Sequence, residues 1–194
     1  MSTLLSQRFE KALVYATRLH AGQVRKGTDI PYVSHLLAVA GLVMEAGGDE
    51  DEIIAALLHD GPEDQGGLAT LNDIRVRFGD RVGDIVAACS DTLEAKKPPW
   101  KSRKQAYLDH LLTADASIRL VSCADKLHNA RAILADYRRI GDSLWDRFNA
   151  GREDILWYYD ELARIFSAYG PDSLADELVR TVDDLKDEIA CGVD

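Results

Sequence analysis

The chain has 194 residues, of which 46% are hydrophobic and 29% are charged, a composition typical of a globular domain with a sizeable core. Its net charge of -10 disfavours nonspecific nucleic-acid binding through a broad basic surface. No apolar run is long enough to cross a bilayer, and the first residues lack the apolar core of a signal peptide. We therefore expect a cytoplasmic protein without nucleic-acid or membrane partners. Three widely spaced cysteines, with no CxxC pair, agree with a reducing compartment.

Apolar residues recur at helical spacing along most of the chain, and no convincing alternating strand pattern is present. The sequence therefore predicts an all-α fold, a single domain over residues 1–194 with roughly nine or ten helices. The predicted helices, in chain order, cover about residues 6–20, 31–46, 49–60, 70–78, 80–90, 100–112, 115–137, 143–149, 153–168 and 172–190. We expect the last helix to pack on its own domain, with packing on a second copy in a homodimer as the alternative.

The most informative stretch is the end of the third predicted helix, where the apolar run 53–58 is followed by His59 and Asp60. Buried charges need partners, so an apolar helix that ends in adjacent ionisable groups indicates a bound metal ion. For this pair alone, the alternative is a histidine that interacts with the helix dipole beside a solvated aspartate.

Two more polar residues lie in helical segments that otherwise read as core. His35 lies at the start of the second predicted helix, and Asp125 lies inside the long predicted helix that begins at residue 115. With His59 and Asp60 they make a set of two imidazoles and two carboxylates, which suits manganese, iron or zinc better than calcium. The alternatives are a packing or capping role for His35 and an ion pair of Asp125 with Lys126 or Arg131.

Together these segments carry a family resemblance. A lone His, then His-Asp, then a distant Asp resembles the pattern of the HD-domain metal-dependent phosphohydrolases. The resemblance narrows to the hydrolase domain of RelA/SpoT proteins on four segments, which are Gln23-Val24-Arg25-Lys26-Gly27, Pro31-Tyr32-Val33-Ser34-His35, Ala56-Leu57-Leu58-His59-Asp60 with Glu63-Asp64, and Ala124-Asp125-Lys126-Leu127-His128-Asn129. It covers about residues 7–168 and leaves the helix predicted at 172–190 outside.

The resemblance implies a single HD-domain helical bundle and, with no synthetase region attached, a small stand-alone alarmone hydrolase. It implies that His35, His59, Asp60 and Asp125 bind one divalent ion, and that the ion is manganese. The residues alone do not choose the metal.

Glu63 and Asp64 follow the predicted ligands and are the candidate catalytic carboxylates. A divalent cation lowers the pKa of a bound water, and nearby carboxylates can orient that water and take its proton. The resemblance implies the same role, and a solvated acidic turn is the alternative. This chain has Gly61-Pro62 where the family commonly has Thr-Val, so we expect a loop of different geometry here, with consequences for substrate preference or rate.

Local basic clusters in an acidic protein indicate binding of a polyanion. The resemblance implies that Arg25 and Lys26 contact phosphates. For the distal phosphates the sequence offers Lys97, Lys101 and Lys104 without choosing among them, and ordinary solvated lysines are the alternative.

Two residues remain as candidates near the nucleotide. Asn129 lies one helical turn after Asp125, and the resemblance gives it a catalytic or nucleotide-binding role. Arg147 is a candidate for nucleotide binding, with a surface ion pair as the alternative.

The function predicted from these features is hydrolysis of the 3'-diphosphate of ppGpp, an alarmone of the stringent response, with release of pyrophosphate. One alternative is an HD phosphohydrolase that acts on another nucleotide or phosphate ester. The other is a nucleotide sensor with little turnover.

Overall fold

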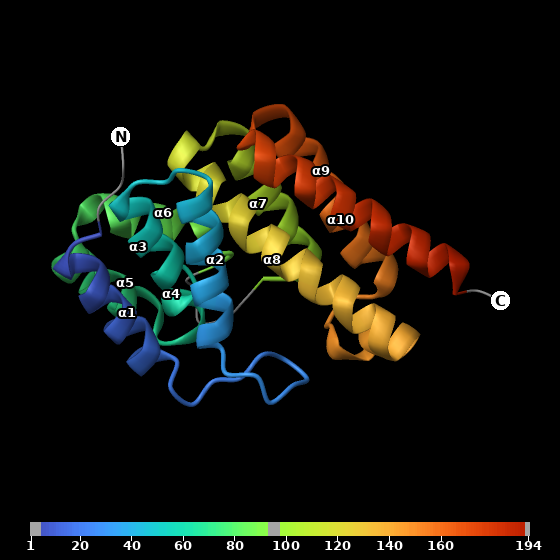
Figure 1. The fold of residues 1–194 in the computed structure, drawn as a ribbon, viewed down its shortest axis with the longest axis horizontal. Coiled ribbons are helices and arrows are strands. Elements are labelled where there is room, and N and C mark those ends of the chain that lie inside the picture. Colours follow the sequence, from blue (N-terminus) through green and yellow to red (C-terminus); the bar gives the residue numbers. More distant parts are fainter. Residues whose placement is uncertain (1–4, 93–97, 193–194) are drawn as a thin grey trace.

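A computed structural model describes residues 5–92 and 98–192 (Figure 1). Over these residues the chain forms ten α-helices and one 3-10 helix, and the β-pairing within them is a single isolated bridge between Val24 and Pro31. The prediction of an all-α fold is confirmed. The bounds are α1 Gln7–Leu19, α2 Val33–Glu45, α3 Glu50–Leu58, α4 Gly61–Asp64, α5 Gly67–Phe78, α6 Asp80–Cys89, α7 Trp100–Thr113, α8 Ala116–Ile140, η1 Gly141–Arg147, α9 Arg152–Tyr169 and α10 Asp172–Cys191.

Helix α3 lies at the centre of the N-terminal half, where it packs against α1, α2, α6 and α8. Asp49 starts it with a capping box, because its side chain accepts from the Glu52 backbone N–H while the Glu52 side chain accepts from the backbone N–H of Asp49. All six residues from Ile53 to Leu58 are buried. A helix buried on every side therefore ends directly at His59.

The segment after Asp60 is helical, so the expectation of a loop there is wrong. Gly61–Asp64 forms the short helix α4, with Pro62 in its first turn, where a proline lacks no needed hydrogen bond. Gly61 is buried, and a Cβ atom at this position would come within 3.0 Å of Leu19 Cδ2. Gly61-Pro62 thus begins a new helical turn shortly after the end of α3, and this turn carries Glu63 and Asp64.

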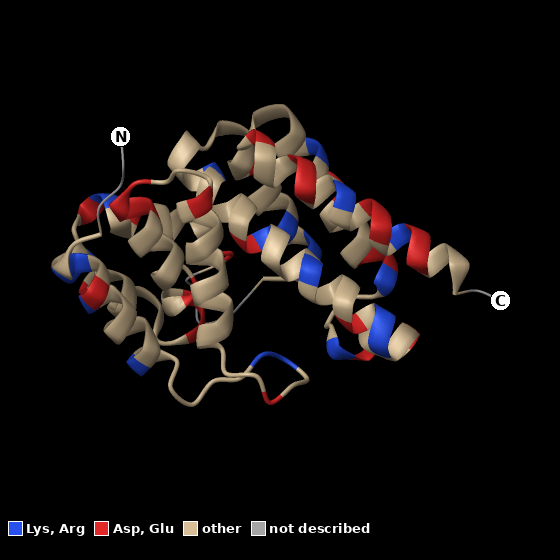
Figure 2. Cartoon of the chain, in the orientation of Figure 1, with Lys and Arg blue, Asp and Glu red and all other residues tan. Residues whose placement is uncertain are grey.

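The long helix α8 runs through the middle of the molecule, and α10 packs along both α8 and α9 (Figure 1). The apolar side of α10, which includes Leu178 and Val182, is buried in the same hydrophobic core as α1 to α3. Aspartate and glutamate positions recur along its length (Figure 2). The expected packing of this helix on its own domain is confirmed. The single domain over 1–194 stays a prediction, which the shared core supports.

Most helix bounds agree with the predicted ones to within three residues. The predicted loop at 91–99 lies mostly outside the described residues, because 93–97 are not described. No helix within 5–92 and 98–192 combines the length and the apolar character that crossing a membrane would need.

Candidate metal centre and active site

Three helical elements bring His35, His59 and Asp125 together in the core. His35 comes from the first turn of α2, His59 directly follows α3, and Asp125 lies in the middle of α8. Their exposed fractions are 0%, 1% and 5%. One ligand atom from each of the three residues lies within 4.8 Å of the other two. The packing of α2, α3 and α8 against one another thus places two imidazoles and a carboxylate around one point.

The fourth predicted ligand, Asp60, adjoins the same point. Its Oδ2 lies 3.4 Å from His35 Nε2 and 3.1 Å from His59 Nε2. On the other side, Asp125 Oδ1 lies 3.2 Å and 3.5 Å from the same two nitrogens. All four predicted side chains therefore face one another.

The two imidazole nitrogens at the centre are the observation that tests whether a cation fits. His35 Nε2 and His59 Nε2 are fully buried and have no hydrogen-bond partner. Burying a polar atom without a hydrogen bond is costly, and the carboxylate oxygens 3.1–3.5 Å away do not form one with either nitrogen. Two nitrogens and two carboxylates facing one point form a donor set suited to a divalent transition metal, so the residues fit such an ion.

The tautomer of His59 is determined by its second nitrogen. His59 Nδ1 lies 2.8 Å from the backbone oxygen of Ala56, which can only accept a hydrogen bond. Nδ1 therefore carries a proton. Burial lowers the pKa of His59, but the carboxylates of Asp60 and Asp125 more than offset this and raise the pKa well above its usual value, so Nε2 is protonated as well in the metal-free protein. A bound ion would displace that proton and use the lone pair of Nε2.

Asp125 remains ionised because of its neighbours. Burial alone would raise the pKa of its carboxyl, but Lys126 and the two imidazoles more than offset this and hold the pKa well below its usual range. Lys126 Nζ donates to Asp125 Oδ2 over 2.6 Å, and Asn129 Nδ2 donates to Asp125 Oδ1 over 2.6 Å. The ion pair with Lys126, weighed from sequence as an alternative to metal binding, thus coexists with the central geometry.

Tyr32 orients Asp60 by donating its Oη–H to Asp60 Oδ2 over 2.6 Å. The pKa of Tyr32 is raised, first by burial and then by the charge of Asp60, so the hydroxyl stays protonated and remains a donor. Sequence reasoning missed this role, although Tyr32 lies in one of the motifs that carry the resemblance.

Glu63 and Asp64 lie on α4, just after the centre. Glu63 Oε2 accepts from the backbone N–H of Asp91 over 3.1 Å. Asp64 Oδ2 accepts from Gln23 Nε2 over 2.7 Å. The pKa of Asp64 is raised, mainly by partial desolvation and next by the charge of Asp60, a change that makes a carboxylate a better base.

The loop between α1 and α2 brings Arg25 to the centre. Arg25 Nη2 donates to Asn129 Oδ1 over 2.7 Å, which links this loop to α8 and, through Asn129, to Asp125. Lys26 is exposed, and Lys97 lies outside the described residues.

The other two residues predicted to bind the substrate form ion pairs with acidic residues that are not among the four predicted ligands. Lys101 is exposed, pairs with Asp154 over 2.7 Å and lies over the ring of Trp157. Arg147 pairs with Asp136 over 2.7 Å. The structure does not bring Lys101 or Arg147 to the centre, and their roles in substrate binding stay predictions.

Arg147 nevertheless lies next to the loop between α1 and α2. Gly27 has a φ of +73°, and a Cβ there would lie 2.7 Å from Cδ and Nε of Arg147. A side chain at position 27 would therefore meet both backbone strain and a steric clash.

Lys104 connects with a candidate catalytic residue. Its Nζ donates to Asp91 Oδ2 over 3.1 Å, alongside Arg103, and the backbone N–H of Asp91 is the group that donates to Glu63. Among the lysines that the sequence left open, Lys104 is thus tied to Glu63, whereas Lys101 is not.

His128, which the sequence analysis did not include among the ligands, lies against His35. The two Nδ1 atoms are 2.8 Å apart. The pKa of His128 is lowered to about 4, first by burial and next by His35 and Arg25, so the ring is neutral near pH 7.

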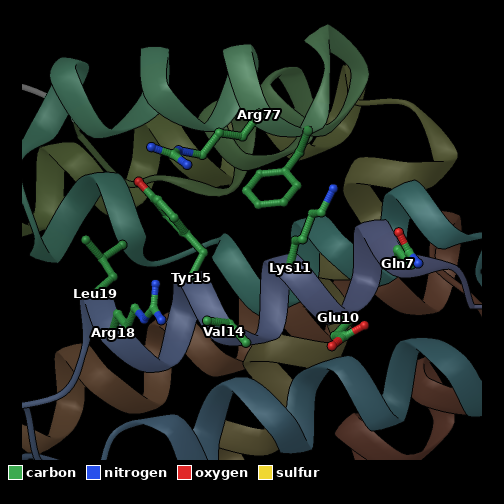
Figure 3. A pocket seen from close by; sticks show the side chains of 9 residues that line it. Gln7, Glu10, Lys11, Val14, Tyr15, Arg18, Leu19 and Arg77 are labelled. Atoms are coloured by element: carbon green, nitrogen blue, oxygen red, sulfur yellow. The ribbon is translucent and has the colours of Figure 1, made fainter.

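A cavity of about 1040 Å³ lies elsewhere, between α1 and the end of α5 (Figure 3). Its lining includes the polar residues Lys11, Tyr15 and Arg77 and the apolar residues Val14 and Phe78. It contains none of the predicted ligands, so its size does not make it the reaction site. The convergence of unpaired imidazoles is the stronger signal.

Comparisons with known proteins agree with this site. Residues 12–156 match the family described as HD domain. A GTP pyrophosphokinase rsh from Brucella suis biovar 1 is 34% identical over 178 residues, and a GTP pyrophosphokinase from Myxococcus xanthus is 32% identical over 172 residues. These matches cover 84% and 82% of this chain but only 23% and 22% of the relatives, so the chain spans about a quarter of their length.

Two solved structures are also similar. One, from a metazoan orthologue of SpoT that is described as hydrolysing ppGpp, has a TM-score of 0.76, 24% identity, and coverage of 93% of this chain and 97% of that one. The other, a protein of Listeria monocytogenes EGD-e, has a TM-score of 0.69, 31% identity, and coverage of 81% and 99%. The chain belongs to the HD domain family, and the family predicted from the motifs is confirmed.

We predict that Asp125→Asn weakens binding of Mn²⁺ at least about tenfold, because even outer contacts of a metal site are worth about that much. The change removes a charge while keeping the size of the side chain. Asp115→Asn is the matched control, since Asp115 caps the same helix and asparagine caps equally well. Calorimetric titration of the metal-free protein checks both. Unchanged affinity in Asp125→Asn would remove Asp125 from the ligand set.

Proposed function

We propose that the protein is a (p)ppGpp 3'-pyrophosphohydrolase that uses Mn²⁺ held by His35, His59, Asp60 and Asp125. The observation that carries the proposal is the pair of buried, unpaired imidazole nitrogens facing two carboxylates, with Glu63 and Asp64 one helical turn away. Support also comes from the likeness to a SpoT orthologue described as hydrolysing ppGpp. The relatives named GTP pyrophosphokinase are about four times longer than the matched segment, so their names describe more than this part.

The reaction requires water to attack the phosphorus nearest the ribose. The water oxygen bonds to that phosphorus, the bond from the phosphorus to the ribose 3'-oxygen breaks, and this oxygen leaves with a proton, giving GDP and pyrophosphate. A bound divalent ion supplies Lewis-acid chemistry, lowering the pKa of a coordinated water and polarising a phosphoryl oxygen. The protein must supply the base and the contacts to charge.

We assign the role of general base to Asp64 rather than Glu63. Its raised pKa improves proton acceptance, and Gln23 fixes one of its oxygens. Glu63 is held from the other side by the backbone of Asp91 and orients the reacting water in this proposal.

The substrate carries several negative charges, which an acidic protein must offset locally. Arg25, held by Asn129 next to the centre, is placed to contact the reacting diphosphate, with exposed Lys26 beside it. We assign the distal phosphate to Lys104 rather than Lys101, because Lys104 is linked through Asp91 to Glu63.

The proposal also includes the cellular compartment and the partners of the protein. Cys89, Cys123 and Cys191 are free, in agreement with a cytoplasmic setting. A homodimer, and the lack of nucleic-acid and membrane partners, stay predictions.

Purified protein loaded with Mn²⁺ is expected to release one pyrophosphate and one GDP from each ppGpp, and to stop after chelation. Glu63→Gln and Asp64→Asn should lower kcat about 10²- to 10⁴-fold while bound Mn²⁺ is unchanged. Absence of pyrophosphate at several pH values, with the metal confirmed bound, would reject the proposal. A panel of nucleotides distinguishes the alternative substrates, since a higher kcat/KM for another nucleotide would replace ppGpp but keep the reaction class.

Lys104→Met should raise the KM for ppGpp about tenfold, since a charge-assisted hydrogen bond is worth about 1.5–3 kcal/mol. Lys101→Met is the matched control and should change KM less than about twofold, because exposed ion pairs contribute little. Thermal unfolding of both variants checks that the fold is intact. Equal effects on KM would contradict the assignment, and a larger effect at Lys101 would reverse it.

Gln23→Leu should move the acidic limb of the kcat–pH profile to higher pH. The hydrogen bond from Gln23 stabilises the ionised carboxylate and lowers the pKa of Asp64, so removing the bond raises that pKa further. The base form is then lost sooner as pH falls. Gln105→Leu, at an exposed position of α7, is the control. A limb that stays in place would show that Asp64 is not the group that titrates.

A further inference from the structure

His128 projects from α8 onto the ring of His35. The ring centroids are 4.8 Å apart, the rings are tilted by 50°, and the two Nδ1 atoms lie 2.8 Å apart, which is hydrogen-bond distance. His128 is not one of the four proposed ligands, so this contact needs an explanation of its own.

A hydrogen bond between two ring nitrogens requires one of them to donate and the other to accept. His35 Nε2 points to Asp60 and Asp125 and has no hydrogen-bond partner. A neutral imidazole that presents a lone pair at Nε2 carries its proton at Nδ1. In that state His35 Nδ1 donates, and His128 Nδ1 must accept.

The two imidazoles of the centre are therefore held in different ways. For His59 the acceptor is the backbone oxygen of Ala56, which can accept a hydrogen bond but cannot donate one. For His35 the acceptor is a side chain that sequence changes can remove. Metal-binding histidines generally have their second nitrogen hydrogen-bonded in this manner, which fixes the ring and raises its basicity.

We infer that His128 is a positioning residue of the metal centre, which accepts the Nδ1 proton of His35 and so holds the Nε2 lone pair toward the ion. The inference rests on the proposed metal centre and not on the identity of the substrate. His128 itself does not bind the ion.

Two substitutions separate the hydrogen bond from packing. In His128→Asn, Oδ1 is attached to Cγ just as Nδ1 is in histidine, so an acceptor remains in nearly the same place. In His128→Phe the ring remains and the acceptor is lost. His110→Phe, at an exposed position on α7, is the control for the same change elsewhere.

The readout is the dissociation constant of Mn²⁺, measured by calorimetric titration of the metal-free proteins, together with thermal unfolding without metal. We expect His128→Phe to weaken binding about 10- to 100-fold, with His128→Asn and His110→Phe within about threefold of the parent. The melting temperatures without metal should stay close together.

The inference is overturned if His128→Phe binds Mn²⁺ as tightly as the parent, or if His128→Asn is as weak as His128→Phe. It also falls if His35→Phe leaves Mn²⁺ binding intact, because the centre then lies elsewhere. Failure to hydrolyse ppGpp, with the expected order of Mn²⁺ affinities, would reject the substrate proposal and leave the role of His128 in place.

Discussion

The whole active region depends on two imidazole nitrogens that the fold buries without hydrogen-bond partners. Such burial costs free energy, and the surrounding structure is arranged to maintain it. The backbone oxygen of Ala56 hydrogen-bonds to the ring of His59, and His128 of α8 contacts the ring of His35. Carboxylate oxygens lie close to the Nε2 atoms of both rings. Helices α2, α3 and α8 meet where they do because their apolar sides pack together, so the core that stabilises the fold is also what positions the donor set.

A second layer of contacts comes from the loop between α1 and α2. Gln23 reaches Asp64, Arg25 reaches Asn129 and Tyr32 reaches Asp60. One short segment thus contacts a proposed ligand, a proposed base and the helix that carries Asp125. His20, at the end of α1, joins this layer through Gln23 and by stacking on Tyr32.

The helices and the residues at the centre could be predicted because both leave local signals. Helical periodicity repeats every few residues, and a histidine or aspartate inside an apolar helix stands out against its neighbours. The contacts of Tyr32 and His128 could not be predicted in this way, because they join residues 28 and 93 positions apart and depend on how the helices pack. Helix α4 was not predicted because Gly-Pro usually ends a helix. Here Gly61 and Pro62 begin the next one. The proposed choice between Lys101 and Lys104 depended on which of the two side chains reaches Asp91, which the sequence of α7 leaves open.

Asp60 and Asp64 belong to a single helical turn, in which the backbone N–H of Asp64 donates to the backbone oxygen of Asp60 over 3.0 Å. One hydrogen-bonded turn thus joins the proposed ligand to the proposed base. In the proposed mechanism, an ion of different radius that shifted the backbone of Asp60 would also shift Asp64, whereas a base on a separate segment would not be coupled in this way. If Asp60 is a ligand and Asp64 the base, as proposed, exchange of one divalent ion for another is expected to change turnover more than it changes occupancy.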